Sequence, residues 1–450
     1  MQILLPYEVR IILNKLQEGG YAAYAVGGCV RDSLLGRSPM DWDITTAAKP
    51  EVIKQVFEKT IDTGIAHGTI TVRMNHQSFE VTTYRVDGEY EDNRHPKHVT
   101  FADSICDDLA RRDFTVNAMA YNEANGLVDP FGGQKDLNDR VIRCVGEANL
   151  RFLEDALRIL RAARFCAQLD FDVMPEVQQA MCRQAERLNS VSAERIREEL
   201  TKTILAGHAD KGIRPLFDSG VLDVILPELS RCFRTTQNIK YHLYDVGTHT
   251  MHVLMNTPQK TGLRYAALFH DLGKPAKKTI DPDGTTHFKG HAEVSVMLAL
   301  EIMHRLKFDN KTIDCVRRLV QYHDREIVPE KKPVKRAVLD VGEDIFLDLL
   351  DLKRADALGQ NLVYTRPRLA LYDEIEQIYH RCREEQEAFC LRDLAVNGRD
   401  LTALGFQGKE IGALLNNLLE YVLERPEENK KENLLQILKK YQNLWLNGIK

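Results

Sequence analysis

The residues best suited to chemistry begin with two adjacent glycines near the N-terminus. Gly27 and Gly28 follow the short apolar run at 24–26, and Arg31 comes three positions later. Glycine lets the backbone approach a ligand closely, freed amides can cradle phosphate oxygens, and a planar guanidinium suits phosphate. The stretch therefore predicts a buried strand that runs into a phosphate-binding turn, with Gly28 and Arg31 as its ligand-contacting residues.

A carboxylate pair, Asp41 and Asp43, follows this turn. Its surroundings look like a strand that ends at Ile44, and the strand period of two would place both carboxylates on one face and Trp42 on the other. Carboxylates this close repel each other unless a cation lies between them, and oxygen ligands suit Mg²⁺. A phosphate cradle beside such a pair predicts a phosphoryl-transfer site, with Asp41 and Asp43 as catalytic, magnesium-binding residues.

A third carboxylate is expected from a β-hairpin. Residues 69–74 and 78–84 alternate or are β-branched around a turn at 75–77, and Glu80 lies in the second strand. From there Glu80 can reach the Asp pair across neighbouring strands and complete a catalytic set of three carboxylates. The alternative is a solvated strand glutamate. The polar residues 86–102 that follow predict a loop.

A charged run at 108–120 offers further contacts to a nucleotide. Arg111 and Arg112 can neutralise the charge of a triphosphate or of RNA, and Asp113 can accept hydrogen bonds from ribose hydroxyls. The alternative is a charged helix start on the surface. We take Arg112, Asp113 and, in the same run, Asn117 as nucleotide-binding candidates.

Residues 149–168 predict one helix, on which Asp155 and Arg158 are neighbours. Cytosine and adenine both present an amino donor beside a ring-nitrogen acceptor, whereas uracil and guanine present the opposite order. An Asp acceptor beside an Arg donor could therefore accept C and A and reject U and G. The alternative is an ordinary salt bridge. Arg158, Arg161 and Arg164 also form a basic stripe, usually explained as a solvated face; Arg161 is kept as a nucleotide-binding candidate.

These motifs carry a resemblance that covers about residues 20–200. The glycine turn followed by D-x-D resembles the DNA polymerase beta nucleotidyltransferase superfamily. The fuller order resembles class II CCA-adding tRNA nucleotidyltransferases and bacterial poly(A) polymerases, and it comprises Gly27–Asp32, Asp41–Asp43, Arg111–Ala120, Asp129–Gly133, Glu154–Arg158 and Glu194–Glu199. The resemblance implies a head that adds nucleotides, a neck that recognises them, and a helical body and tail that grip tRNA. Its partners would be ATP, CTP and tRNA, and its cofactor Mg²⁺.

Two further features bear on the branch of this family. His67–Val72 resembles the CCA-adding branch, and no basic, RNA-tethering extension of the kind found in poly(A) polymerases is evident. Separate CC-adding and A-adding enzymes share most of the motifs. The intact loop at 127–137 argues against an enzyme that adds only CC.

A second constellation of metal-ligand residue types occupies 240–360. Neutral imidazoles and carboxylates bind transition metals, and an adjacent His-Asp pair can bind one ion or bridge two. Any one histidine alone is more often a surface or core residue. The ordered set resembles the HD phosphohydrolase superfamily, which implies a divalent transition metal and phosphoester hydrolysis, and it consists of His249, His270, Asp271, His291, His323 and Asp356. Asp324 is a rival for the last ligand, and His242, His252 and His287 are left unassigned.

The chain thus predicts a multidomain protein with an α/β nucleotidyltransferase head, built on a mixed sheet with helices, followed by all-α neck, HD and tail domains. The expected boundaries are 1–145 for the catalytic head, 146–225 for the helical neck and body with the recognition motif, 226–384 for the HD-type domain, and 385–450 for a helical, tRNA-binding tail.

Net charge, cysteine pattern and hydrophobicity restrict how the protein can bind RNA and where in the cell it is expected. The formal net charge is −5, so RNA contact must come from local basic faces. The nine cysteines include no C-x-x-C pair, which favours reduced thiols and a cytoplasmic protein. No apolar run approaches the roughly 20 residues of a membrane helix. No membrane association and no obligate protein partner are expected.

The favoured interpretation is a cytoplasmic enzyme that adds C, C and A to the 3′ end of tRNA, with an HD domain that hydrolyses phosphoesters. The closest rival is a poly(A) polymerase or an A-adding enzyme. A rival of another class is an HD nucleotide phosphohydrolase whose N-terminal domain only binds RNA. A non-catalytic tRNA-binding protein would leave two complete metal sites without purpose.

Overall fold

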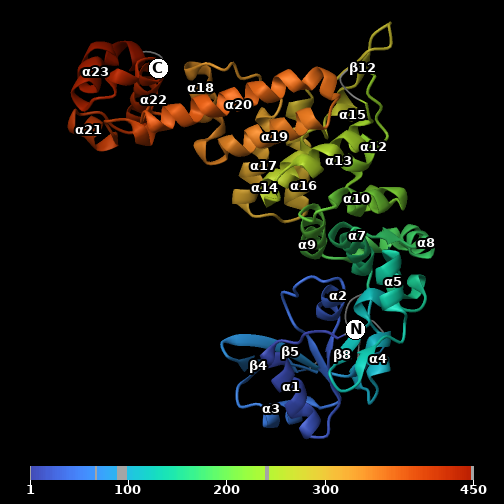
Figure 1. Ribbon diagram of the computed structural model, residues 1–450. Helices are drawn as coiled ribbons and strands as arrows, with labels where there is room; N and C mark the ends of the chain where they lie inside the picture. Colours follow the sequence, from blue (N-terminus) through green and yellow to red (C-terminus); the bar gives the residue numbers. More distant parts are fainter. Residues whose placement is uncertain (1, 66–67, 89–98, 239–242, 447–450) are drawn as a thin grey trace. The chain divides into compact units, whose positions relative to one another are not determined.

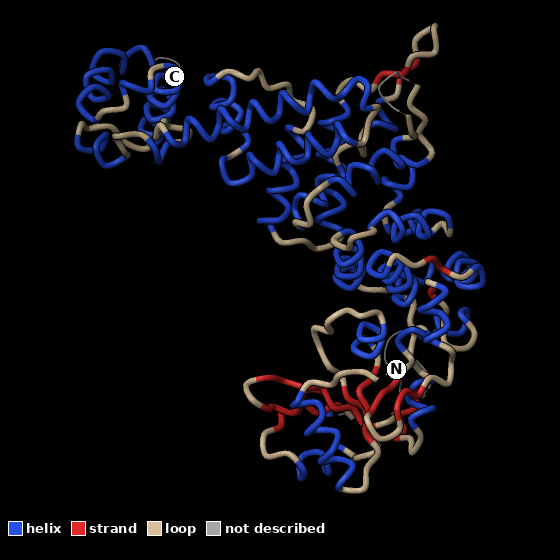
Figure 2. The backbone as a smooth tube through the Cα atoms, in the orientation of Figure 1, coloured by secondary structure: helices blue, strands red, loops and turns tan. Residues whose placement is uncertain are grey.

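The computed structural model describes residues 2–65, 68–88, 99–238 and 243–446 (Figure 1). The chain forms two compact units, Met1–Pro227 and Glu228–Lys450. The first contains a sheet and helices, whereas the second is almost wholly helical (Figure 2). The predicted fold class, an α/β head followed by helical domains, is therefore confirmed. Within the described residues, no helix is long and apolar enough to cross a membrane.

The head is built on a mixed sheet of seven strands. Strand β2 runs parallel to β5, and every other neighbouring pair is antiparallel. In spatial order the strands are β3 (Thr60–Gly64), β4 (Thr69–Met74), β5 (Gln77–Thr83), β2 (Ile44–Thr46), β1 (Ala23–Val26), β8 (Ala120–Asn122) and β9 (Gly126–Val128). The parallel pair brings the start of β2 beside the middle of β5, which positions the candidate carboxylates.

Short helices accompany the sheet, and buried apolar side chains form its core, among them Tyr24, Val26, Tyr84 and Leu109. The helices are α1 (Tyr7–Glu18), α2 (Gly28–Leu34), α3 (Pro50–Val56), α4 (Ile105–Ala110) and α5 (Gly133–Asp139), with a 3₁₀ turn at Thr115–Asn117.

Two local predictions in the head are wrong. Asp41 and Asp43 do not lie in a strand that ends at Ile44, because β2 begins at Ile44 and both aspartates precede it. Residues 86–102 are not simply a loop, because β6 (Arg85–Asp87) pairs with β7 (Val99–Phe101) in an antiparallel ribbon. The β-branched and aromatic residues at its ends favour strands, and the polar positions 89–98 lie outside the described residues.

The single helix predicted at 149–168 is also wrong. Helix α6 (Ala148–Glu154) stops at Asp155, whose backbone is extended (φ −142°, ψ 107°), and α7 (Leu157–Leu169) follows. The Asp155 carboxylate accepts a hydrogen bond from the amide of Leu157 at 3.0 Å. Aspartate can replace a helical hydrogen bond with such a local one, so the break falls at this residue.

Helix α7 is packed between other helices of the first unit. It packs against α9 (Ala193–Ile204) and α10 (Ala209–Asp218). At Gly212 of α10 a Cβ would lie 2.5 Å from a methyl of Thr203 and 2.9 Å from the Ala163 carbonyl, so only glycine allows this approach. The remaining elements are β10 (Val141–Ile142), paired in parallel with β11 (Asp172–Val173), α8 (Pro175–Gln184), a 3₁₀ helix at Ala185–Ser190, and α11 (Val221–Ile225).

The second unit begins with a group of helices that lie side by side (Figure 1). Helix α19 contacts α13, α14, α17 and α20, and α16 contacts α14 and α17. In chain order these are α12 (Pro227–Phe233), which starts at the boundary, α13 (Val246–Asn256), α14 (Thr261–Phe269), α15 (Lys274–Lys277), α16 (His291–Arg305), α17 (Asn310–Tyr322), α18 (Lys331–Val341), α19 (Phe346–Leu358) and α20 (Leu362–Glu384). A small ribbon pairs β12 (Thr279–Ile280) with β13 (Thr286–His287).

The C-terminal helices of this unit have their own apolar core. They are α21 (Gly398–Ala403), α22 (Lys409–Glu424) and α23 (Lys431–Leu446), and Leu414, Leu418 and Leu434 are buried among them. A partly buried ion pair joins the segment that precedes these helices to α18, because Lys335 donates to Glu387 at 2.6 Å.

Candidate functional site

The first unit contains a cavity of about 870 Å³ whose lining is strongly cationic. Among the described residues, eight arginines and four carboxylates line it. The arginines are Arg31, Arg85, Arg111, Arg112, Arg158, Arg161, Arg164 and Arg195, and the carboxylates are Asp43, Glu80, Asp113 and Asp155. An excess of guanidinium groups suits a polyanion such as a triphosphate.

The glycine turn forms one wall of this cavity. Gly27 has φ 81°, which side chains rarely adopt, and a Cβ there would lie 2.9 Å from a guanidinium nitrogen of Arg112. Gly28 begins α2 and also lines the cavity. Arg31 donates to the Asn117 side-chain oxygen at 2.6 Å and to Asp32 at 2.9 Å. The fold thus brings three of the predicted ligand-contacting residues, Gly28, Arg31 and Asn117, to one wall.

The predicted carboxylates meet at the parallel strand pair. Ile44 of β2 pairs with Val81 of β5, so Asp43 and Glu80, the residues before them, lie beside each other. The pKa of the Asp43 carboxyl is raised above its ordinary value by desolvation and then by the charge of Glu80, while Arg112 opposes the rise and Asp41 adds to it. Asp41 thus acts on Asp43 electrostatically but does not line the cavity. Mutually repelling oxygen ligands of this kind fit a hard divalent cation.

Asp113 is already engaged by protein partners. It is buried and accepts hydrogen bonds from the Arg161 guanidinium at 2.7 Å, the Asn117 amide at 3.2 Å and the backbone of Phe114 at 2.8 Å. Burial works against its charge, but Arg161 and Asn117 lower the pKa of Asp113 to about 2. Asp113 is therefore ionised and holds Arg161 in place, which is a role that the sequence did not suggest.

Asp155 and Arg158 are not neighbours on one helix, since the break at Asp155 separates them. Asp155 instead accepts from Arg195 of α9 at 3.1 Å. Arg158 pairs with Glu154 and donates to the backbone carbonyls of Arg151 and Arg111, each at 3.2 Å. Both side chains nevertheless line the same cavity, so the fold keeps the acceptor and the donor together there.

The arginines of α7 are not a solvated stripe. Arg158 and Arg164 are buried, and Arg164 donates to Glu199 of α9 at 3.0 Å. The buried ring of Phe165 lies under three guanidinium groups, with its centroid 5.3 Å from Arg31, 5.6 Å from Arg161 and 4.5 Å from Arg164. Desolvated cations over an aromatic face are attracted to it, so Phe165 helps to aim these side chains.

Residue patterns alone gave no role to Phe165, Arg195 or Glu199, although Arg195 and Glu199 lie in the run Glu194–Glu199 that carries part of the resemblance. These two residues are four apart and share one face of α9. Their contacts depend on how α9 packs against α7, which no local pattern specifies.

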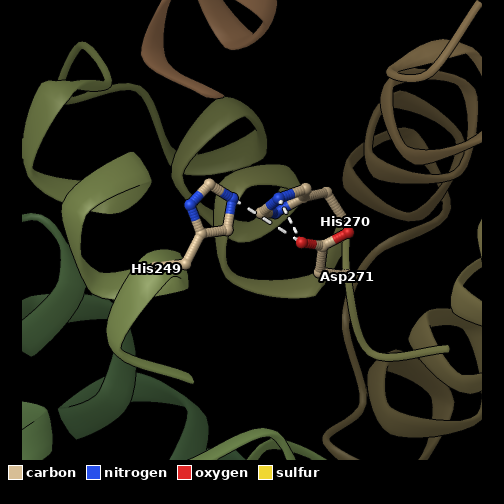
Figure 3. A group of neighbouring side chains, drawn as sticks. All are labelled: His249, His270 and Asp271. Atoms are coloured by element: carbon tan, nitrogen blue, oxygen red, sulfur yellow. Dashed lines mark ion pairs between the residues drawn. The ribbon is translucent and has the colours of Figure 1, made fainter. Parts of the chain in front are cut away.

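The second constellation converges in the second unit on Asp271. His249 comes from α13, and His270 and Asp271 follow α14 directly (Figure 3). The Nε2 atoms of His249 and His270 lie 3.6 Å and 3.2 Å from one Asp271 oxygen. His291 Nε2, at the start of α16, lies 3.3 Å from the other oxygen.

Two possible metal-ligand groups share this aspartate. One is His249, His270 and Asp271, and the other is Asp271, His291 and His323. In the described part of the chain these are the groups of three ligand atoms within 4.8 Å of one another, and the head carboxylates are not among them. Asp356 of α19 lies 3.0 Å from His249 Nε2, whereas its rival Asp324 is exposed.

All four imidazoles of the cluster are oriented in the same way. Each Nδ1 atom faces a backbone carbonyl, those of Gly359, Ala267, Phe288 and Val320, at 2.7–3.1 Å. An Nδ1–H that donates to a carbonyl leaves the Nε2 lone pair for a metal. His270 Nε2 is buried, and it has no hydrogen-bond partner of normal geometry within the described residues. These donors fit a transition-metal ion.

The charges of Asp271 and His323 agree with this, whereas burial opposes protonation of His270 but Asp271 and Asp356 raise its pKa above the ordinary value. Burial opposes ionisation of Asp271, but His270 and Lys274 hold its pKa well below the usual range. Burial and the neighbouring His270 lower the pKa of His323 to about 3, so that imidazole is neutral. The unassigned His252 stacks on Tyr244, His287 pairs with Asp281 on the surface, and His242 lies outside the described residues, as does His67.

Comparison with known families divides the chain into three matching segments. Residues 23–143 match the Poly A polymerase head domain. Residues 170–233 match the probable RNA and SrmB-binding site of polymerase A, and residues 239–360 match the HD domain.

Curated relatives are CCA-adding enzymes. The enzyme of Lactobacillus johnsonii is 47% identical over 214 residues, which are 48% of this chain and 54% of that protein. The chain therefore spans about half the length of the curated relatives that it matches at this identity. The enzyme of Lactobacillus helveticus is 32% identical over 436 residues, which cover 95% of both chains.

Solved structures with the same fold are also CCA-adding enzymes. That of Bacillus stearothermophilus in complex with CTP has a TM-score of 0.73 and 28% identity, and covers 99% of this chain and 100% of that one. That of Thermotoga maritima with tRNA has a TM-score of 0.57 at 21% identity, covers 98% of this chain and 97% of that one, and indicates the fold alone.

The geometry of the Asp271 cluster predicts tight binding of a divalent transition metal. After removal of bound metal, we expect the protein to take up Mn²⁺, Ni²⁺ or Zn²⁺, and His270→Ala to weaken uptake by more than about tenfold, because it removes a buried ligand. His287→Ala, which changes an exposed histidine of the same unit, is the matched control. Calorimetric titration with each metal measures the effect. Equal affinity in wild type and His270→Ala would rule out a metal site here.

Proposed function

Because the chain belongs to the CCA-adding enzyme family, we propose that it adds C, C and A to the 3′ end of tRNA, using CTP and ATP and no nucleic-acid template. The observation that carries the proposal is the arginine-lined cavity, in which a glycine turn, the Asp43–Glu80 pair and the Asp155/Arg158 pair face one space. A relative of the same name aligns over 95% of the chain.

In the reaction the 3′-oxygen of the tRNA attacks the α-phosphorus of the nucleotide, a new phosphodiester forms, and pyrophosphate leaves. Arg31 and Arg112, which lie beside the glycine turn, would bind the triphosphate. Asp41 and Asp43, with Glu80, would hold Mg²⁺, which supplies charge neutralisation of the triphosphate and activation of the attacking hydroxyl. Asp113 holds Arg161 toward the same space.

Asp155 and Arg158 select the base in this proposal. Asp155 accepts from the exocyclic amino group, and Arg158 donates to N3 of cytosine or N1 of adenine. Arg195 and the amide of Leu157 orient the acceptor, and Glu154 orients the donor. A pair fixed in this way reads one edge pattern, which both C and A present.

The proposed function also assigns tRNA-binding segments to the chain. The four-domain division remains a prediction, in which 146–225 and the tail at 385–450 contact tRNA, and the protein is proposed to be cytoplasmic. A poly(A) polymerase or an A-adding enzyme is the rival that the same cavity would also serve.

A second candidate function belongs to the second unit, where the buried histidine–aspartate cluster favours phosphoester hydrolysis. The cluster would hold a divalent metal that activates water. The water oxygen attacks phosphorus, the bond to the ester oxygen breaks, and that oxygen takes up a proton as the alcohol leaves. Within this site Lys274 contacts Asp271 at 2.7 Å and keeps the carboxylate charged.

Nucleotide addition should require the head carboxylates. We expect the protein, given tRNA that lacks its last nucleotides, Mg²⁺, CTP and ATP, to restore the full end, and Asp43→Ala or Asp41→Ala to lower turnover at least about tenfold, a barrier change of about 1.4 kcal/mol. Asp139→Ala, an exposed aspartate of α5, is the control and should match wild type. Gel assays of end extension measure this.

Several outcomes would contradict the proposal. Extension with ATP alone on any RNA would indicate a poly(A) polymerase, and ATP addition only to tRNA ending in CC would indicate an A-adding enzyme. Wild-type turnover in both aspartate variants would place the reaction elsewhere.

Asp155 should control base choice. Asp155→Asn keeps an acceptor for the Leu157 amide but adds a donor that can pair with uracil. We expect incorporation of C and A to fall together, by about tenfold or more, since a charge-assisted bond contributes about 1.5–3 kcal/mol, and discrimination against UTP to weaken, although Arg158 still opposes the N3–H of uracil. Asp170→Asn, at the other end of α7, is the control.

Single-nucleotide incorporation with each of the four NTPs makes the comparison. If Asp155→Asn excluded UTP and GTP as sharply as wild type, Asp155 would be only a structural residue at the helix break.

A further inference from the structure

We propose that the cavity beside the Asp271 cluster contains a phosphoester-binding subsite whose central residue is Arg368, and this rests on the hydrolytic function proposed for the second unit. Arg368 belongs to α20, which begins at Leu362, beyond the segment at 239–360 that matches the HD domain. The match to the HD domain therefore does not include Arg368, although this residue lies within the predicted HD-type domain at 226–384.

The guanidinium of Arg368 makes its short hydrogen bonds to neutral groups. It donates to the side-chain oxygen of Gln360 at 3.1 Å and to the Tyr372 hydroxyl at 3.2 Å, and both are neutral. Its ion pair with Asp356 is a long one, at 3.8 Å, and the charge of Asp324 in the same cavity also acts on it. A guanidinium fixed by neutral groups keeps its charge and its planar fork for an anion with two free oxygens.

Three other cations of this cavity are engaged with the protein, and a fourth, Lys289, is exposed. Lys274 bonds to Asp271 at 2.7 Å, Arg325 to Asp340 at 2.6 Å, and Lys353 to the carbonyls of His323 and Arg325 at 2.7 and 2.6 Å. Lys274 and Arg325 are thus neutralised by close carboxylates, and two carbonyls hold the ammonium of Lys353. In the described structure Arg368 differs from Lys274 and Arg325, because its carboxylate partner Asp356 is 3.8 Å away.

The position of Arg368 relates it to the cluster. Asp356 lies 3.8 Å from Arg368 through one oxygen, and its other oxygen lies 3.0 Å from His249 Nε2. A phosphate group held by Arg368 is therefore next to the ligands on which hydrolysis would depend. The cavity measures about 960 Å³, and Phe288, Tyr364 and Tyr372 line it, which suits a ligand of nucleotide size.

A purely structural role would make Arg368 the residue that fixes Asp356. Gln360 already does this, because its amide donates to both oxygens of Asp356 at 3.1 and 3.0 Å. Removing the guanidinium should therefore leave Asp356 in place. Metal content separates the two roles, since a displaced Asp356 would disturb the cluster.

Arg366→Gln provides a matched comparison for Arg368→Gln. Arg366 lies two residues earlier on the same helix, is exposed, and does not line the cavity. Both variants lose one positive charge. Calorimetric titration with inorganic phosphate, with and without Mn²⁺, reports the subsite, and phosphate bound in the head contributes equally to both variants.

We expect Arg368→Gln to bind phosphate about tenfold or more weakly than Arg366→Gln, with unchanged metal content and folding, and Arg368→Lys to recover part of the loss. Equal phosphate affinity in the two glutamine variants would overturn the subsite. Loss of bound metal in Arg368→Gln would also overturn it, in favour of a structural role.

Hydrolysis assays distinguish this inference from the function on which it rests. A phosphomonoester and a phosphodiester of one nucleoside are compared, and the substrate whose KM rises in Arg368→Gln is the one that the subsite holds. Unchanged KM for both, in a protein that hydrolyses them, would overturn the subsite and leave the hydrolase. Phosphate binding that depends on Arg368 in a protein without hydrolysis would support the subsite and contradict the hydrolase.

Discussion

Ion pairs made by α7 fix the geometry on which the head site depends. Arg161 binds Asp113, and Arg164 binds Glu199 of α9; Asp113, Arg164 and Glu199 are buried, and Arg161 is partly buried. A charge removed from water costs several kcal/mol unless it is paired, so these guanidinium groups have few alternative positions. The site therefore consists of arginines whose directions are set by their partners, and Phe165 supports them from below.

Buried charges also fix the site of the second unit, where a metal ion is the expected partner. Asp271 and the imidazoles around it are buried, and Lys274 is the cation that contacts this aspartate. Each imidazole Nδ1 faces a backbone carbonyl, so the Nε2 atoms point to the common space around Asp271. A divalent metal ion would stabilise this cluster better than protonation of the imidazoles, because neutral imidazole and carboxylate are the preferred ligands of such an ion.

From the sequence, the residues of each site could be predicted more accurately than their local backbone geometry. Spacing and residue type placed Asp43 with Glu80, and His270 with Asp271, because motif order along strands and helices constrains where side chains meet. It failed at Asp155, where an aspartate that bonds to the Leu157 amide outweighs a continuous helical pattern. Arg195 and Glu199 belong to the run Glu194–Glu199 that carried part of the resemblance, but their contacts with Asp155 and Arg164 could not be predicted, because these depend on how α9 packs against α7.

The central claim is that one fixed pair of side chains reads both bases. Crystal structures of the protein with CTP and with ATP test it most directly. We expect both bases in one place, with the amino group on Asp155 and the ring nitrogen on Arg158, and with the triphosphates on Arg31 and Arg112. Bases bound in two different places, or contacts that leave Asp155 paired with Arg195 alone, would contradict the account.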